Sequence, residues 1–222
     1  MIPLHDDHPT RTVSFVTLAL IGANLLAFIH ELRLPPTQIG DFLLQFGLVP
    51  ALLTHGGHAA DYRTVFTSMF LHGGWMHLIG NMLYLWIFGN NIEDAVGHAR
   101  FVLFYLLCGV AAAVTQVVIE PDSTVPMIGA SGAVSGVLGA YLLLYPRARI
   151  TLLVPIWIFI RFIEVPAVLM LLFWFGLQLL SGLAVLKLNA SGGVAFWAHV
   201  GGFAAGLLLI PFFKQRRIRL FQ

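Results

Sequence analysis

Residues 126–145 read PMIGASGAVSGVLGAYLLLY, and this stretch predicts a helix that crosses a membrane. It contains no charged residue, and small residues recur at every fourth position, at Gly132, Gly136 and Ala140. Small residues four apart let two helix backbones approach closely inside a bilayer. Measured from Ser131, the helix is about 22 Å long, whereas the hydrocarbon core is about 30 Å thick. We therefore expect Ser131 to lie below the bilayer surface.

The rest of the chain is equally apolar. Hydrophobic residues make up 59% of its 222 residues and charged residues only 10%, whereas soluble domains contain about 25% charged residues. Six windows without charge can each supply the roughly 20 residues that a spanning helix needs. We expect an all-α membrane protein with helices near 13–30, 73–91, 100–119, 130–145, 165–186 and 195–213. The predicted organisation is a short segment 1–12, a membrane domain 13–213 and a basic tail 214–222.

The distribution of positive charge predicts the orientation, since Lys and Arg favour the cytoplasmic side. With six spans both termini share one side, and that side holds most of the basic residues. They are Arg11, Arg100, Arg147, Arg149, Lys214, Arg216, Arg217 and Arg219, against Arg33, Arg63 and Lys187 on the other side. We therefore expect both termini in the cytoplasm. We also expect the first apolar stretch to be a retained helix, because it lacks a small-residue cleavage site.

Two connections between the predicted helices are unusually apolar. Residues 31–72 form a long first loop whose apolar pieces are too short to span, which favours a loop partly embedded in the interface. Residues 150–160 are apolar but short, hold Pro155 and are followed by Arg161. We interpret this second stretch as an interfacial approach to the fifth helix and not as a seventh span.

Polar side chains inside a membrane are costly and indicate function by default. Five stand out, namely His72, His77, Asn81, Ser131 and His199. On the predicted topology, all five fall in the non-cytoplasmic halves of their helices. This shared depth suggests that they form one site.

Ser131 and His199 can form a nucleophile and base pair. Alone, Ser131 is compatible with a simple helix cap, and His199 with a buried core histidine. However, Gly202 and Gly206 follow the histidine on its helix and give it a small-residue face like that of the serine helix. Close packing of the two faces would bring the hydroxyl to the imidazole, which can take its proton.

A triad would need a third residue to orient the histidine, commonly an acid. No acid lies within the predicted spans, and the nearest candidates are the loop or boundary residues Glu120, Asp122 and Glu164. The sequence therefore favours a dyad in which packing holds the imidazole.

His77 and Asn81 are four residues apart and share one helix face. Their N–H groups can stabilise an oxyanion during acyl transfer, although hydrogen bonding between helices is the alternative role. A metal site is disfavoured, because the H-E-x-x-H pattern of helical zinc proteases is absent.

These motifs together resemble the rhomboid intramembrane serine proteases. GASG, AHVGGFAAG and HGGWMHLIGN match the segments that carry the family's serine, histidine and oxyanion residues, and EDAVG resembles its E-x-x-x-G motif. The resemblance implies a six-helix rhomboid bundle with Ser131 as nucleophile and His199 as base. It implies that His77 and Asn81 are oxyanion donors and that Gly129 shapes the turn. Structural support near the site is expected from His72, Glu93, Gly97, Gly132, Gly202 and Gly206. Ser135 departs from the pattern, because some members place there an aromatic ring that stacks on the histidine.

The implied activity is cleavage of single-span transmembrane proteins within the lipid bilayer, by a Ser-His dyad through an acyl-enzyme. We expect no cofactor, no metal and no nucleic-acid partner, and the sequence does not indicate an oligomeric state. A prokaryotic inner membrane is expected because no targeting extension is seen, with the site open to the non-cytoplasmic side. The alternatives are a catalytically silent rhomboid-like protein that binds membrane proteins, and a small transporter with a polar path.

Overall fold

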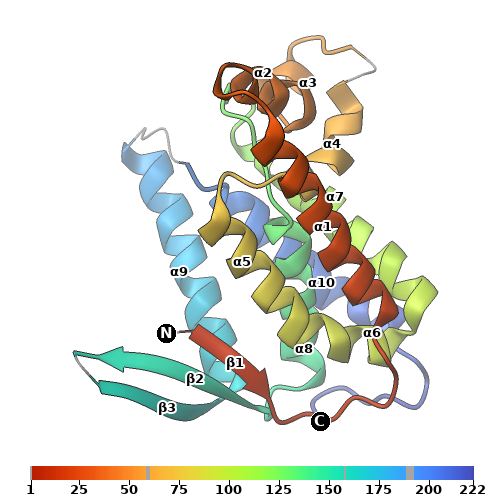
Figure 1. Cartoon of the computed structure of the whole chain (residues 1–222). Coiled ribbons are helices and arrows are strands. Elements are labelled where there is room, and N and C mark those ends of the chain that lie inside the picture. Colours follow the sequence, from red (N-terminus) through yellow and green to blue (C-terminus); the bar gives the residue numbers. More distant parts are fainter. Residues whose placement is uncertain (1, 59–60, 158, 189–192) are drawn as a thin grey trace.

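Helices dominate the computed structural model, which describes residues 2–58, 61–157, 159–188 and 193–222 (Figure 1). Within these ranges four helices are long and apolar enough to cross a membrane. They are α1 (Phe15–Arg33), α7 (His98–Ile119), α9 (Ala167–Leu188) and α10 (Phe196–Phe213). A shorter apolar helix, α8 (Ser131–Leu144), begins at the serine. All five coincide with predicted helices.

The second predicted helix is an unbroken helical run of three parts. It consists of α5 (Trp75–Tyr84), a π-helical turn η3 (Leu85–Gly89) and α6 (Asn90–Val96). The run ends at Gly97, whose φ of 89° lies in the left-handed region that favours glycine. Helix α7 starts at the next residue, so Gly97 makes the sharp change of direction between two helices.

The long first loop is built of short helices that gather at one end of the bundle (Figure 1). They are α2 (Pro36–Phe46), α3 (Pro50–Thr54), η1 (Asp61–Arg63), α4 (Thr64–Thr67) and η2 (Ser68–Phe70). Each is too short to cross a bilayer, as the sequence indicated.

A small sheet at the other end corrects the all-α expectation. Strands β1 (Ile2–Asp6), β2 (Arg149–Ile156) and β3 (Phe159–Pro166) form an antiparallel sheet in the order β1-β2-β3. Residues 150–156 and 159–160 thus belong to two paired strands that lead into α9, a structure the sequence did not predict, and this stretch forms no spanning helix among the described residues. Ile150 and Leu152 are buried while the residues beside them are not, and this alternation is typical of a half-buried strand.

Helix α8 is mostly buried and packs against both α7 and α10, which also pack against each other. Its backbone touches that of α10, because a Cβ at Gly139 would lie 2.2 Å from the carbonyl oxygen of Phe203. Helix α9 is the opposite case. Among its described residues only Ala167, Leu171 and Gly182 are buried, so it packs loosely against the rest.

Both chain ends lie at the sheet end of the bundle (Figure 1). The backbone N–H groups of Phe221 and Gln222 donate to the carbonyls of Leu143 and Leu144 at the end of α8. The short first-loop helices and the start of α8 lie away from this end. Ser131 is thus separated from the termini by the length of α8.

Candidate active site

Ser131 and His199 meet where α8 and α10 begin. Ser131 is the first residue of α8, and His199 lies in the first turn of α10. The serine Oγ lies 2.8 Å from the Nε2 atom of the histidine, so the hydroxyl can donate directly to the ring. This is the contact that a serine nucleophile needs with its base.

The other ring nitrogen of His199 is held by Gln178 of α9. The amide Oε1 of Gln178 lies 2.7 Å from Nδ1 and accepts its hydrogen bond. The ring of Trp174, one turn earlier on α9, lies 6.0 Å from the imidazole between centroids. Ser135 takes no part in this, because its hydroxyl donates to the carbonyl of Ser131 at 2.6 Å.

Sequence reasoning missed Gln178, because the search for an orienting group considered only acids. Two of the acids considered have other partners, since Asp122 pairs with His55 at 2.8 Å and Glu164 with Arg149 at 3.5 Å. The available signal was the isolated amide in the charge-free window 165–186.

His77 and Asn81 of α5 converge on Gly129, two residues before the serine. A Cβ at Gly129 would lie 2.6 Å from Nε2 of His77 and 3.6 Å from Nδ2 of Asn81. Gly129 also has a φ of 118°, so only glycine suits both the space and the backbone. The Gly73 N–H donates to Nδ1 of His77 at 3.4 Å, which leaves Nε2 to carry the proton. The amide nitrogen of Asn81 is buried and has no partner among the described residues.

His72 lies behind His77, with 5.0 Å between ring centroids. It is buried, and its backbone N–H donates to the carboxylate of Glu31 at 3.2 Å. Glu31 lies within α1, which continues to Arg33. Glu31 follows directly after the predicted span 13–30, and it lies inside the helix because α1 is longer than its charge-free window.

Glycines bring three helices together directly beneath the serine. A Cβ at Gly202 would lie 2.0 Å from the carbonyl oxygen of Gly132, and one at Gly132 would lie 2.6 Å from Cβ of Ala112. Gly206 repeats the contact one turn further on, against the carbonyl of Gly136. These contacts fix α10 against α8 and so set the distance between His199 and Ser131.

Comparison with known proteins identifies the family of this chain. A family model described as the Rhomboid domain matches residues 59–216, which is most of the chain. The chain belongs to the rhomboid family. The family and the long apolar helices together make this rhomboid an integral, multi-pass membrane protein.

Several curated relatives are similar over most of this rhomboid. Rhomboid protease GluP of Bacillus subtilis is 31% identical over 211 residues, which cover 93% of this chain and 36% of the relative. Rhomboid protein 1, mitochondrial, of Saccharomyces cerevisiae is 30% identical over 228 residues, covering 96% of this chain and 58% of the relative. This rhomboid thus spans only about a third to three fifths of the length of these two relatives.

Glu93 and Gly97 of this rhomboid lie at the opposite end from the dyad, which corrects the expectation that they support the site. The buried Glu93 carboxylate accepts from the backbone N–H groups of Val16 and Thr17, at 2.9 and 2.7 Å, and contacts His98 at 2.6 Å. Thr17 is about 21 Å along α1 from Glu31 at 1.5 Å per residue. Glu93 therefore caps α1 at the sheet end.

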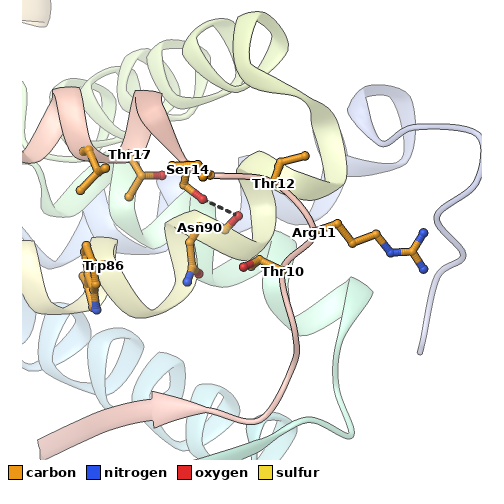
Figure 2. Close-up of a pocket in the computed structure, with 9 residues that line it drawn as sticks. Thr10, Arg11, Thr12, Ser14, Thr17, Trp86 and Asn90 are labelled. Carbon is orange, nitrogen blue, oxygen red and sulfur yellow. Dashed lines mark hydrogen bonds between the residues drawn. The ribbon is translucent and has the colours of Figure 1, made fainter.

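A cleft of about 380 Å³ lies at this same end, beside the start of α1. Figure 2 shows the hydroxyls of Thr10 and Ser14 beside it, while the Arg11 side chain points away. Ser14 donates to the carbonyl of Asn90 at 3.4 Å across it. This cleft is separate from the Ser131 site.

Two further clefts border the dyad region. One of about 130 Å³ is lined by His77, Gln116 and Glu120 among others, which gives it a polar wall. The other, of about 370 Å³, is apolar and lies between α9 and the end of α5, over the sheet, and it extends along α9 as far as Trp174 and Leu177. The polar cleft thus shares His77 with the site, and the apolar groove approaches it at Trp174, whose ring lies 6.0 Å from that of His199.

Proposed function

We propose that this rhomboid is an intramembrane serine endopeptidase that uses Ser131 and His199 as a dyad. The observation that carries the proposal is the 2.8 Å contact between the hydroxyl and Nε2 across two helices. A hydroxyl is a weak nucleophile until a neighbouring base takes its proton. Glycine contacts hold the two helices close together. Each ring nitrogen of His199 has a partner, since Nδ1 contacts Gln178 and Nε2 contacts Ser131.

The reaction would follow acyl transfer in two halves. Nε2 of His199 takes the Ser131 proton as Oγ attacks the scissile carbonyl, and the protonated ring then gives that proton to the leaving amine. Water repeats the sequence on the acyl-enzyme: its proton goes to Nε2 and its oxygen bonds the acyl carbon. The bond from that carbon to Oγ then breaks as Nε2 returns the proton to Ser131. The polar cleft beside His77 offers a route for that water.

The oxyanion would be met by His77, Asn81 and the backbone N–H of Ser131. Replacing Asn81 by alanine is expected to lower kcat by about 10²-fold, with KM nearly unchanged, because the donor acts mainly on the charge of the transition state. Steady-state cleavage of a peptide or transmembrane substrate measures both constants. A rise in KM with unchanged kcat would contradict this role.

The expected substrate is a single-span membrane protein that lies in the apolar groove between α5 and α9. Only a locally unwound segment exposes carbonyls free of helical hydrogen bonds, so cleavage is expected near the membrane boundary. We further propose six spans, with α8 and the run Trp75–Val96 added to the four long helices. Both termini would then lie in the cytoplasm, with the dyad open to the other side of a prokaryotic plasma membrane.

Incubation with a panel of single-span substrates tests the proposal. The intact protein should cut at least one substrate, and Ser131→Ala should abolish the product, with the site mapped by mass spectrometry. The Ser135→Ala protein is a matched control, since among the described residues the Ser135 hydroxyl bonds the Ser131 carbonyl and neither side chain of the dyad. Cleavage that persists in Ser131→Ala would reject the dyad, and binding without cleavage by the intact protein would favour a silent rhomboid.

A further inference from the structure

One face of α9 contacts α10, and Gln178 lies in the middle of it. Phe175 stacks on Phe203 with 4.6 Å between ring centroids, and Gly182 packs against the ring of Trp197. Gln178 lies between these contacts along α9 and reaches His199. The glutamine is therefore directed inward by apolar packing on both sides.

The amide is costly at this position unless it has a partner. Helix α9 is otherwise almost wholly apolar, and a polar group in hydrocarbon loses its hydrogen bonds to water. The hydrogen bond between Oε1 of Gln178 and Nδ1 of His199, at 2.7 Å, offsets that cost. A leucine would suit the helix better, so the glutamine is explained by the bond it makes.

We propose that Gln178 is a positioning residue that holds His199 in its reactive tautomer; the inference rests on the proposed function. An amide oxygen can only accept, so Nδ1 must carry the proton when it bonds Gln178. Nε2 is then unprotonated and free to accept from Ser131, 2.8 Å away. Gln178 thus takes the place of the acid in a triad without bringing a charge into the membrane.

Glutamine also has an amide nitrogen that could donate, which would give the opposite tautomer. Glutamate discriminates between the two arrangements, because its ionised carboxylate only accepts. We therefore compare Gln178→Leu, which keeps the volume and removes the acceptor, with Gln178→Glu, which keeps the acceptor. Leu180→Ala is the matched control, since Leu180 lies on the exposed face of the same helix.

Labelling by a fluorophosphonate and cleavage both measure the reactivity of Ser131. Gln178→Leu is expected to slow both by about 10- to 100-fold, the range found when the hydrogen-bond partner of a metal-bound histidine is removed. Gln178→Glu should retain the activity lost in Gln178→Leu, and Leu180→Ala should match the intact protein. Equal rates in Gln178→Leu and the intact protein would overturn the proposal.

Nitrogen-15 NMR of histidine-labelled protein reads the tautomer without any turnover. The His199 signals are those missing from His199→Ala, and we expect a protonated Nδ1 in the intact protein and mixed tautomers in Gln178→Leu. A proton on Nε2 in the intact protein would overturn the proposal even if the variants fail to fold. If Ser131→Ala cleaves normally while the tautomer is as expected, only the proposed function fails.

Discussion

Alanine in place of His199 is expected to slow fluorophosphonate labelling of Ser131 by a factor on the order of 10⁴. The probe forms a bond from Oγ to phosphorus as fluoride leaves, and Nε2 must take the serine proton for this to happen. The structure offers the serine hydroxyl one basic neighbour at 2.8 Å among the described residues. Its removal leaves a serine of ordinary reactivity at the end of a helix.

His58→Ala is the control for this experiment, since His58 lies exposed in the first loop. It should label at the rate of the intact protein. The His199→Ala protein must also show an unchanged thermal unfolding midpoint in detergent, so that the loss reports chemistry and not unfolding. Labelling of His199→Ala at the original rate would mean that another group activates Ser131.

Gly206→Ala is expected to destabilise the protein by about 3 kcal/mol, at the upper end of overpacking effects. Its Cβ would lie 1.9 Å from the carbonyl oxygen of Gly136, and a helix backbone cannot yield as a flexible side chain can. Helices α8 and α10 would have to separate, which also draws His199 away from Ser131. The thermal unfolding midpoint in detergent and the rate at which the fluorophosphonate labels Ser131 should therefore both decrease.

Gly22→Ala separates this effect from the general consequence of replacing a helical glycine. A Cβ at Gly22 of α1 meets nothing within 4 Å, so alanine there should leave stability unchanged or raise it by up to about 1 kcal/mol. Equal unfolding midpoints for the Gly206→Ala and Gly22→Ala proteins would mean that α8 and α10 are further apart than the structure shows.

The helices could be predicted because a membrane imposes a simple rule on composition. Windows without charge located α1, α7, α8, α9 and α10 and most of the run from Trp75. The small-residue faces of α8 and α10 also predicted that Ser131 and His199 could meet, since spacing along a helix determines which residues share a face. Both inferences depend on local sequence alone.

What escaped prediction depends on contacts between distant segments. The sheet joins Ile2–Asp6 to a hairpin far along the chain, and an apolar strand of this length resembles a short piece of helix. The resemblance placed Glu93 near the site, but pairing with the start of α1 puts it at the other end. Gln178 was missed because only acids were considered as orienting groups, and its contact with His199 joins two helices that the sequence does not place side by side.

The attachment of α9 has a mechanical consequence. Its first residues are held at the sheet end, where the N–H of Ala167 donates to Ala148 at 2.8 Å and that of Val168 to Pro146 at 3.0 Å. Gln178 lies about 16 Å further along the helix. Because Gln178 is this far from the anchored end, a tilt of α9 by about 10° about that end displaces Gln178 by about 3 Å. That displacement would break the hydrogen bond between Gln178 and Nδ1 of His199. A small tilt of this loosely packed helix would therefore leave the catalytic base without its orienting partner.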